Sequence, residues 1–182
     1  MVPLALSTWL LGSTGSALAE CAGLADGRFE ATLGGAISAT LDWQGSALEC
    51  DAMPRPDGEG QRLRFRGPLE PGVMLTVVIG IDGLVAGRTG RELPANLTLV
   101  VEEHGLFFGS RQQGVCWADV MENAPEGETH RVRGEVYCVR GLAALGAEAS
   151  VSVTDLRFTG TLGPDADGDG EEDAEHAAIT PP

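Results

Sequence analysis

The chain has 182 residues, 43% of them hydrophobic, which is enough to bury a core and excludes a wholly disordered protein. The 27 acidic and 12 basic residues give a net charge of −15, and every basic residue is an arginine. Nucleic acid and anionic lipid surfaces repel a chain of this charge, so neither is expected as a partner.

The first twenty residues have the pattern of an export signal. An apolar run over residues 2–11 leads to small residues that end at Ala19 in the A-x-A motif cleaved by signal peptidase. Residues 1–19 are therefore predicted to be a signal peptide, with Glu20 as the mature N-terminus. No Lys or Arg precedes the apolar run. Two alternatives stay open, a start codon placed elsewhere and a buried N-terminal helix.

No other stretch approaches the roughly 20 apolar residues of a membrane-spanning helix, so no membrane-spanning segment is expected. The predicted location is bacterial and outside the cytoplasm: periplasmic, at the cell surface, or secreted.

The four cysteines all follow the predicted cleavage point, and an even number in an exported chain favours disulfides. We expect Cys21 to pair with Cys50, and Cys116 with Cys138, because each pair brackets a compact run of predicted strands. The other two connectivities remain alternatives. A zinc site is disfavoured because no two cysteines have C-x-x-C spacing.

Residues 18–21, LAEC, resemble a bacterial lipobox, in which the cysteine is lipidated after cleavage. The pattern requires Gly, Ala or Ser before the cysteine, and Glu20 stands there. Lipidation of Cys21 would also leave an odd thiol among the remaining cysteines. A lipid-tethered envelope protein is therefore kept as an alternative.

After the leader the hydrophobic pattern has a period of two, which is typical of half-buried strands. Residues 130–139 place Val132, Val136 and Cys138 on one face and charged residues and Tyr137 on the other. In residues 149–162 the parity changes near Thr154 and Asp155, which predicts a β-bulge. Further strands are expected at residues 28–33, 36–43, 61–67, 73–79, 96–102, 105–109 and 115–119.

These elements predict an all-β fold over residues 20–163, an antiparallel β-sandwich of immunoglobulin-like or jelly-roll-like type. Only residues 142–149 could form one or two helical turns. Trp117, beside Cys116, is predicted to pack in the core against a disulfide, as in immunoglobulin-like sandwiches. The aromatic residues are too few to form both a core and a sugar-binding strip.

Residues 164–182 form a separate acidic tail. Carboxylates alternate in it and a glycine follows, in the pattern D-x-D-x-D-G-x-x-D. The pattern resembles the calcium loops of thrombospondin type-3 repeats and dockerins. The resemblance implies a calcium ion held by the side chains of four aspartates and the main-chain carbonyl of one glutamate: Asp165, Asp167, Asp169, Glu171 and Asp173.

Two features of the tail depart from that family pattern. His176 stands where an EF-hand loop has its bidentate glutamate, and no second copy of the motif follows. The alternative is an acidic, disordered tail that keeps the protein soluble.

No catalytic set is recognisable. There is no G-x-S-x-G motif, and the three histidines lie apart in the sequence. His104 is expected in a turn between two strands. The sequence therefore favours an exported, non-catalytic binding or structural module whose partner is an unidentified protein or envelope component. A secreted hydrolase with a dispersed active site is the alternative.

Overall fold

The computed structural model describes residues 19–20, 26–56, 59–110 and 114–163, and these form the all-β sandwich that the sequence predicts. The described helices are two three-residue 3₁₀ turns, η2 (Gly45–Ala47) and η3 (Glu102–His104), and neither could cross a membrane. The strands are β1 (Ala19–Glu20), β2 (Arg28–Gly35), β3 (Ala39–Gln44), β4 (Glu49–Pro54), β5 (Gln61–Glu70), β6 (Val73–Ile81), β7 (Gly90–Val101), β8 (Leu106–Gly109), β9 (Cys116–Glu126), β10 (Thr129–Cys138), β11 (Leu142–Ala144) and β12 (Ser150–Leu162).

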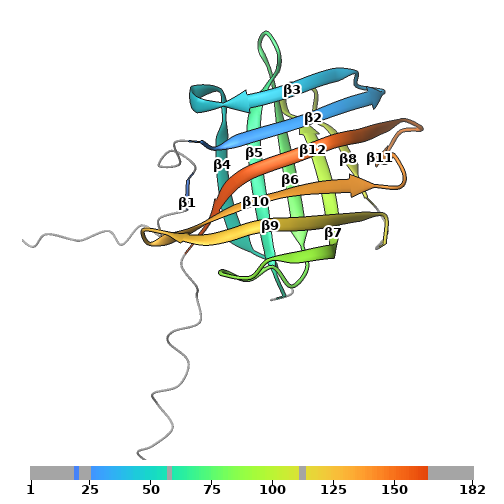
Figure 1. Ribbon diagram of the computed structural model, residues 1–182. Helices are drawn as coiled ribbons and strands as arrows, with labels where there is room; N and C mark the ends of the chain where they lie inside the picture. The colour runs from blue at the N-terminus through green and yellow to red at the C-terminus, as the bar shows by residue number, and fades with distance from the viewer. Residues whose placement is uncertain (1–18, 21–25, 57–58, 111–113, 164–182) are drawn as a thin grey trace, which may run out of the picture.

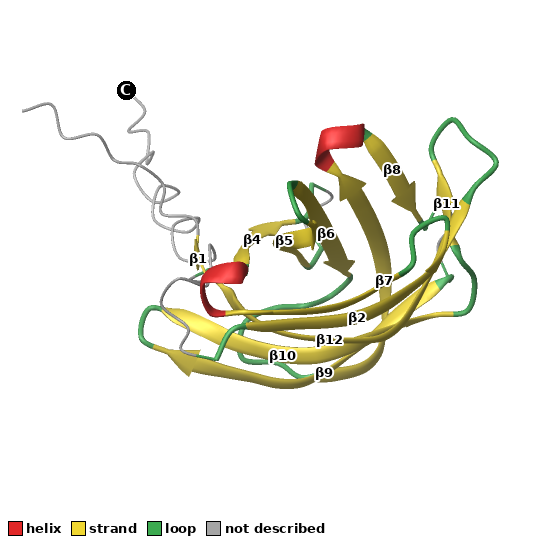
Figure 2. Cartoon of the chain, turned by 90° about the horizontal axis from the view of Figure 1, so that it is seen from above, coloured by secondary structure: helices red, strands yellow, loops and turns green. Residues whose placement is uncertain are grey.

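The strands form two layers, and every described pairing is antiparallel. The front layer has the order β3-β2-β12-β10-β9, and the back layer has the order β1-β4-β5-β6-β7-β8. In Figure 1 the front strands run across the back strands, and Figure 2 shows the layers from above. This is the orthogonal type of sheet packing, in which bent strands pass from one sheet to the other.

Two strands join the layers. The first part of β7 pairs with β9, from Gly90 to Ala95, and its second part pairs with β6 and β8. The short strand β11 pairs with both β8 and β12. The front and back layers are therefore hydrogen-bonded into one 12-stranded sheet. The one or two helical turns that residues 142–149 could form are not found, because Leu142–Ala144 form β11 and pair with these two strands.

The predicted alternation in β10 is confirmed. Val132, Gly134 and Val136 are buried, whereas Arg133 and Tyr137 are exposed. The predicted bulge is confirmed as well. Between β12 and β2 the register shifts by one residue after Thr154, and Asp155 has a φ of 54°.

The core lies between the layers and is built from the inward side chains of both. Its aromatic members are Phe29, Trp43, Phe65, Phe108 and Phe158, each no more than 3% exposed. Phe29 stacks on Trp43 with 4.9 Å between ring centroids, and the Trp43 indole donates a hydrogen bond of 2.9 Å to the carbonyl of Pro68. The buried set spreads over both layers, as expected for a single domain.

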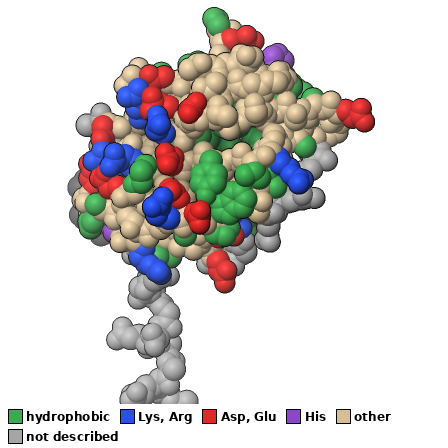
Figure 3. Space-filling model, turned by 45° about the vertical axis from the view of Figure 1, so that its right-hand side comes forward, with side chains coloured by type: hydrophobic (Ala, Val, Ile, Leu, Met, Phe, Trp, Pro, Cys, Tyr) green, Lys and Arg blue, Asp and Glu red, His purple; other side chains and the backbone are tan. Residues whose placement is uncertain are grey.

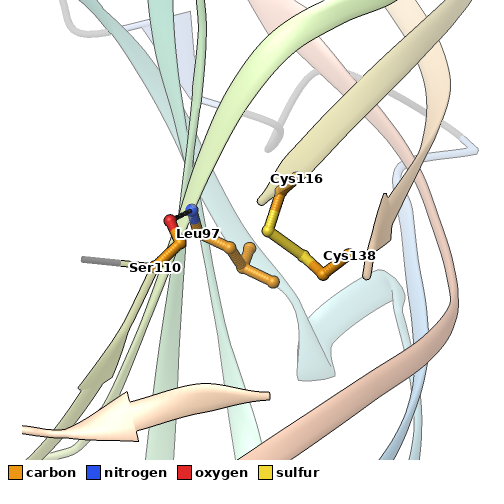
Figure 4. The surroundings of a disulfide bond; sticks show 4 residues. All are labelled: Leu97, Ser110, Cys116 and Cys138. Atoms are coloured by element: carbon orange, nitrogen blue, oxygen red, sulfur yellow. Dashed lines mark hydrogen bonds between the residues drawn. A yellow bond between two sulfur atoms is a disulfide. The ribbon is translucent and has the colours of Figure 1, made fainter. Parts of the chain in front are cut away.

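The predicted disulfide between Cys116 and Cys138 is present, and it links neighbouring strands β9 and β10. Figure 4 shows the Leu97 side chain of β7 pointing toward it from the back layer. Cys50 is also disulfide-bonded. Its predicted partner, Cys21, lies outside the described residues.

Candidate functional site

The outward face of the front layer carries interleaved acidic and basic side chains. Because side chains of adjacent strands stand opposite one another, the charges of β2, β3, β9, β10 and β12 form cross-strand pairs. Figure 3 shows red and blue side chains interspersed on the surface, with hydrophobic side chains gathered beside them. The ion pairs of this face include Arg28 with Glu30 (3.0 Å) and Asp42 (3.1 Å), Arg133 with Glu122 (3.2 Å), and Arg157 with Glu135 (4.0 Å).

Three adjoining hollows indent this face, and Glu135 of β10 lines all of them. We call them together the Glu135 groove. The first, of about 360 Å³, lies between β2 and β9 and includes Arg28 and Arg133. The second, of about 470 Å³, extends to β7 and includes Arg91 and Asp119. The third, of about 210 Å³, is lined by Glu135, Tyr137 and Asp155 among others.

Irregular backbone surrounds the groove. Only two non-glycine residues in the described part of the chain have positive φ, Glu92 (53°) and Asp155 (54°), and both lie at register shifts that border the groove. A third shift occurs between β9 and β10 beside Met121. Bulges re-aim side chains, and strained backbone concentrates at functional sites, so these features mark the groove as a candidate site.

An aromatic pair stands at one end of the groove. Trp117 and Tyr137 are directly opposite each other on β9 and β10, and their rings stack with centroids 5.7 Å apart and an interplanar angle of 22°. Tyr137 is 41% exposed. The prediction that Trp117 packs in the core is wrong, because Cys116 points inward and successive side chains of a strand alternate.

Charged groups surround the Tyr137 hydroxyl. Desolvation raises the pKa of Tyr137 above its ordinary value, and the carboxylates of Glu92 and Asp119 raise it further. Asp119 accepts a hydrogen bond of 2.6 Å from the main-chain N–H of Glu92, which fixes the irregular turn of β7. The Arg91 guanidinium lies 3.5 Å from Asp119 and lowers the pKa of Tyr137 in part.

The aromatic pair could have been found from the sequence. The alternation that placed Tyr137 outward and Cys138 inward also requires Trp117 to point outward if Cys116 points inward. The grouping of Glu135 with Asp119, Arg91 and the bulges could not have been found from the sequence, because it depends on the bend of β7 and on the strand order.

The sequence-predicted calcium ligands, Asp165, Asp167, Asp169, Glu171 and Asp173, lie outside the described residues. Within the described part of the chain no group of three or more His, Cys, Asp or Glu could hold a metal ion. His104 lies in the turn η3 between β7 and β8, as predicted.

The fold and the groove together define an all-β sandwich with an open, charged and partly aromatic outer face. Comparison with protein-family models, with curated proteins and with solved structures finds no match to this chain.

Proposed function

We propose that this protein is an exported, non-catalytic binding module that engages its ligand through the Glu135 groove and the aromatic pair. The observation that carries the proposal is the stack of the half-buried Trp117 on the exposed Tyr137, on a face that also carries ion pairs. Rigid aromatic side chains that keep one apolar surface in water are favoured contacts in binding sites.

Export is supported by the disulfide between Cys116 and Cys138, because such bonds persist in oxidising compartments. The leader pattern of residues 1–19 is consistent with it. Mass spectrometry of the mature N-terminus distinguishes a free chain that begins at Glu20 from a lipid-tethered chain that begins at Cys21.

A secreted hydrolase is the second candidate, and one observation favours it. Asp119 and Glu135 are direct cross-strand partners on the floor of the groove. Two neighbouring carboxylates are the catalytic equipment of glycoside hydrolases. Asp119 accepts a hydrogen bond from the main-chain N–H of Glu92, and Glu135 lies 4.0 Å from Arg157. Both carboxylates therefore also have structural partners.

The test uses the full-length, oxidised protein with a panel of glycans and peptides. Ligand binding is followed by the indole N–H signal of Trp117 in a nitrogen–proton correlation spectrum. Trp43, 2% exposed, is the internal control. A saturable shift of Trp117 alone, with the ligand recovered intact, supports a binding module. If the ligand is turned over instead, and Glu135→Gln abolishes the turnover, the protein is a hydrolase and the binding-module proposal is wrong.

A further inference from the structure

The third hollow of the Glu135 groove lies on the side of Tyr137 that Trp117 does not cover. Trp117 stacks on Tyr137 from β9, whereas the hollow is lined by residues of β10 and β12, among them Glu135, Asp155 and Arg157. One side of the Tyr137 ring therefore borders a space of about 210 Å³, which we call the Tyr137 slot. Pockets for drug-sized ligands have roughly 300 to 1,000 Å³, so the slot matches a single side chain.

Acidic groups outnumber basic ones around the slot. Glu135 and Asp155 line it, and Glu92 and Asp119 lie near the Tyr137 hydroxyl. Among the described residues that line the slot or act on the pKa of Tyr137, the basic ones are two exposed arginines, Arg91 beside Asp119 and Arg157 beside Glu135. The surroundings of Tyr137 therefore carry more negative than positive charge, and the whole chain has the same sign, with a net charge of −15.

Two of these carboxylates are available to a ligand. Asp155 makes no ion pair with any other described residue, and the bulge holds it at the rim of the slot. Among the described residues, the one ion pair of Glu135 is its 4.0 Å contact with Arg157, whose side chain is 61% exposed. An incoming cation can therefore take the place of Arg157 at Glu135 without losing a short ion pair.

A planar cation matches both the ring and the carboxylates. Guanidinium groups stack on aromatic faces and donate forked hydrogen bonds to carboxylates, and cations are attracted to the electron-rich face of tyrosine. We propose that the Tyr137 slot binds the guanidinium group of an arginine side chain presented by a partner polypeptide. This inference rests on the proposed binding function and names the ligand chemistry of that same site.

The test titrates the oxidised full-length protein with Nα-acetyl-argininamide, and with its neutral isostere Nα-acetyl-citrullinamide as the control. The chain has three tryptophans, Trp9, Trp43 and Trp117, and the Trp117 signal is assigned with Trp117→Phe. We expect the arginine compound to shift the Trp117 indole signal saturably and to leave Trp43 in place. Binding should weaken as salt is added, since the carboxylates are exposed.

Variants separate the ring from the charges. Tyr137→Ser should weaken binding about twofold to fivefold, the range of an exposed cation–π contact, while Tyr137→Phe retains it. Glu135→Gln and Asp155→Asn should each weaken binding about twofold. Asparagine tolerates the positive φ of position 155. Asp42→Asn is the matched control, because Asp42 lies on the same outer face but pairs with Arg28.

Several results would overturn the inference. An equal shift with the citrulline compound would exclude recognition of charge. A shift of Trp117 with a neutral oligosaccharide but not with the arginine compound would mean that the ligand is a sugar. The proposed binding function would then still hold. No shift of Trp117 with any ligand of the panel would count against both proposals.

Discussion

Arg66 of β5 and Glu102 of η3 form a two-point ion pair on the outer face of the back layer. Nε of Arg66 donates to Oε1 of Glu102, and Nη2 donates to Oε2, each over 2.8 Å. Thr76 Oγ1 donates a further hydrogen bond of 2.7 Å to Oε1. The bonds from Arg66, followed by that from Thr76, lower the pKa of Glu102 from 4.5 to about 2, and Glu102 in turn raises the pKa of Arg66.

This pair predicts a specific pH dependence of stability. Since the pKa of Glu102 is lower in the folded chain than in the unfolded chain, its stabilising effect is complete above about pH 4.5 and is lost as the pH falls toward 2. We expect the free energy of unfolding to fall more steeply across this window in the wild type than in Glu102→Gln. Urea unfolding at several pH values measures both slopes, and equal slopes would contradict the assignment.

The disulfide between Cys116 and Cys138 is expected to stabilise the fold by restricting the unfolded chain. The two cysteines are 22 residues apart in the sequence, and closing a loop of this size is worth about 3 kcal/mol on the chain-entropy model. The double variant Cys116→Ala, Cys138→Ala should lose about that much free energy of unfolding in urea. Alanine avoids placing a hydroxyl at the fully buried position 116. A loss below about 1 kcal/mol would rule out the entropic explanation.

Asn123 of β9 holds the loop that connects β6 to β7. Its Nδ2 donates to the carbonyls of Val85 and Arg88, both over 2.8 Å, and its Oδ1 accepts from the N–H of Gly87 over 3.0 Å. Asn123 is only 8% exposed. Asn123→Ala removes partners from these main-chain groups and should cost about 1 to 3 kcal/mol of unfolding free energy.

A second substitution at this position tests the direction of the hydrogen bonds. Asn123→Asp keeps an acceptor for Gly87 but turns a carboxylate oxygen toward two carbonyls. We expect Asn123→Asp to be less stable than Asn123→Ala at neutral pH and to recover when the carboxylate is protonated. Hydrogen exchange of the Gly87 amide is the local measurement. Fast exchange in Asn123→Ala with unchanged protection of β10 amides would locate the damage in the loop.

Local alternation predicted most strands, since each strand has one face in the core. It also located the bulge at Asp155, because inward side chains can change parity along a strand only where a residue is added. Strand β4 (Glu49–Pro54) was missed because its residues 50–52 are all buried, so no alternation is visible there. Asp51 is 4% exposed on the outer side of β4, where Arg64 donates a hydrogen bond of 2.8 Å to it.

The candidate site was less accessible to prediction than the fold. Its residues come from β7, β9, β10 and β12, and their proximity depends on the order of the strands in the front layer. The first half of β7 was not predicted, although it brings Arg91 to the groove. Pairing between strands that are distant in the sequence leaves no local pattern. The inward or outward direction of Trp117, in contrast, can be read from the alternation of its neighbours.

The acidic tail carries the last prediction, since calcium binding by Asp165, Asp167, Asp169, Glu171 and Asp173 remains a proposal. An isolated loop without a bidentate glutamate should bind calcium with a Kd of roughly 10⁻⁴ to 10⁻³ M. Calorimetric titration of the full chain should therefore give saturable heat with millimolar calcium. Asp167→Asn combined with Asp169→Asn should abolish that heat, because both carboxylates occupy liganding positions.

Glu171→Gln combined with Glu172→Gln is the matched control for the double variant. It also removes two negative charges from the tail, but position 171 is predicted to use its main-chain carbonyl, which the substitution retains, and position 172 is not a predicted ligand. Calcium affinity should then stay within about twofold of the wild type, since a more distant charge is screened by salt. A loss in this control as large as in Asp167→Asn with Asp169→Asn would mean that the tail attracts calcium only through its total charge. Absence of heat in the wild type would leave the tail as a solubilising acidic segment.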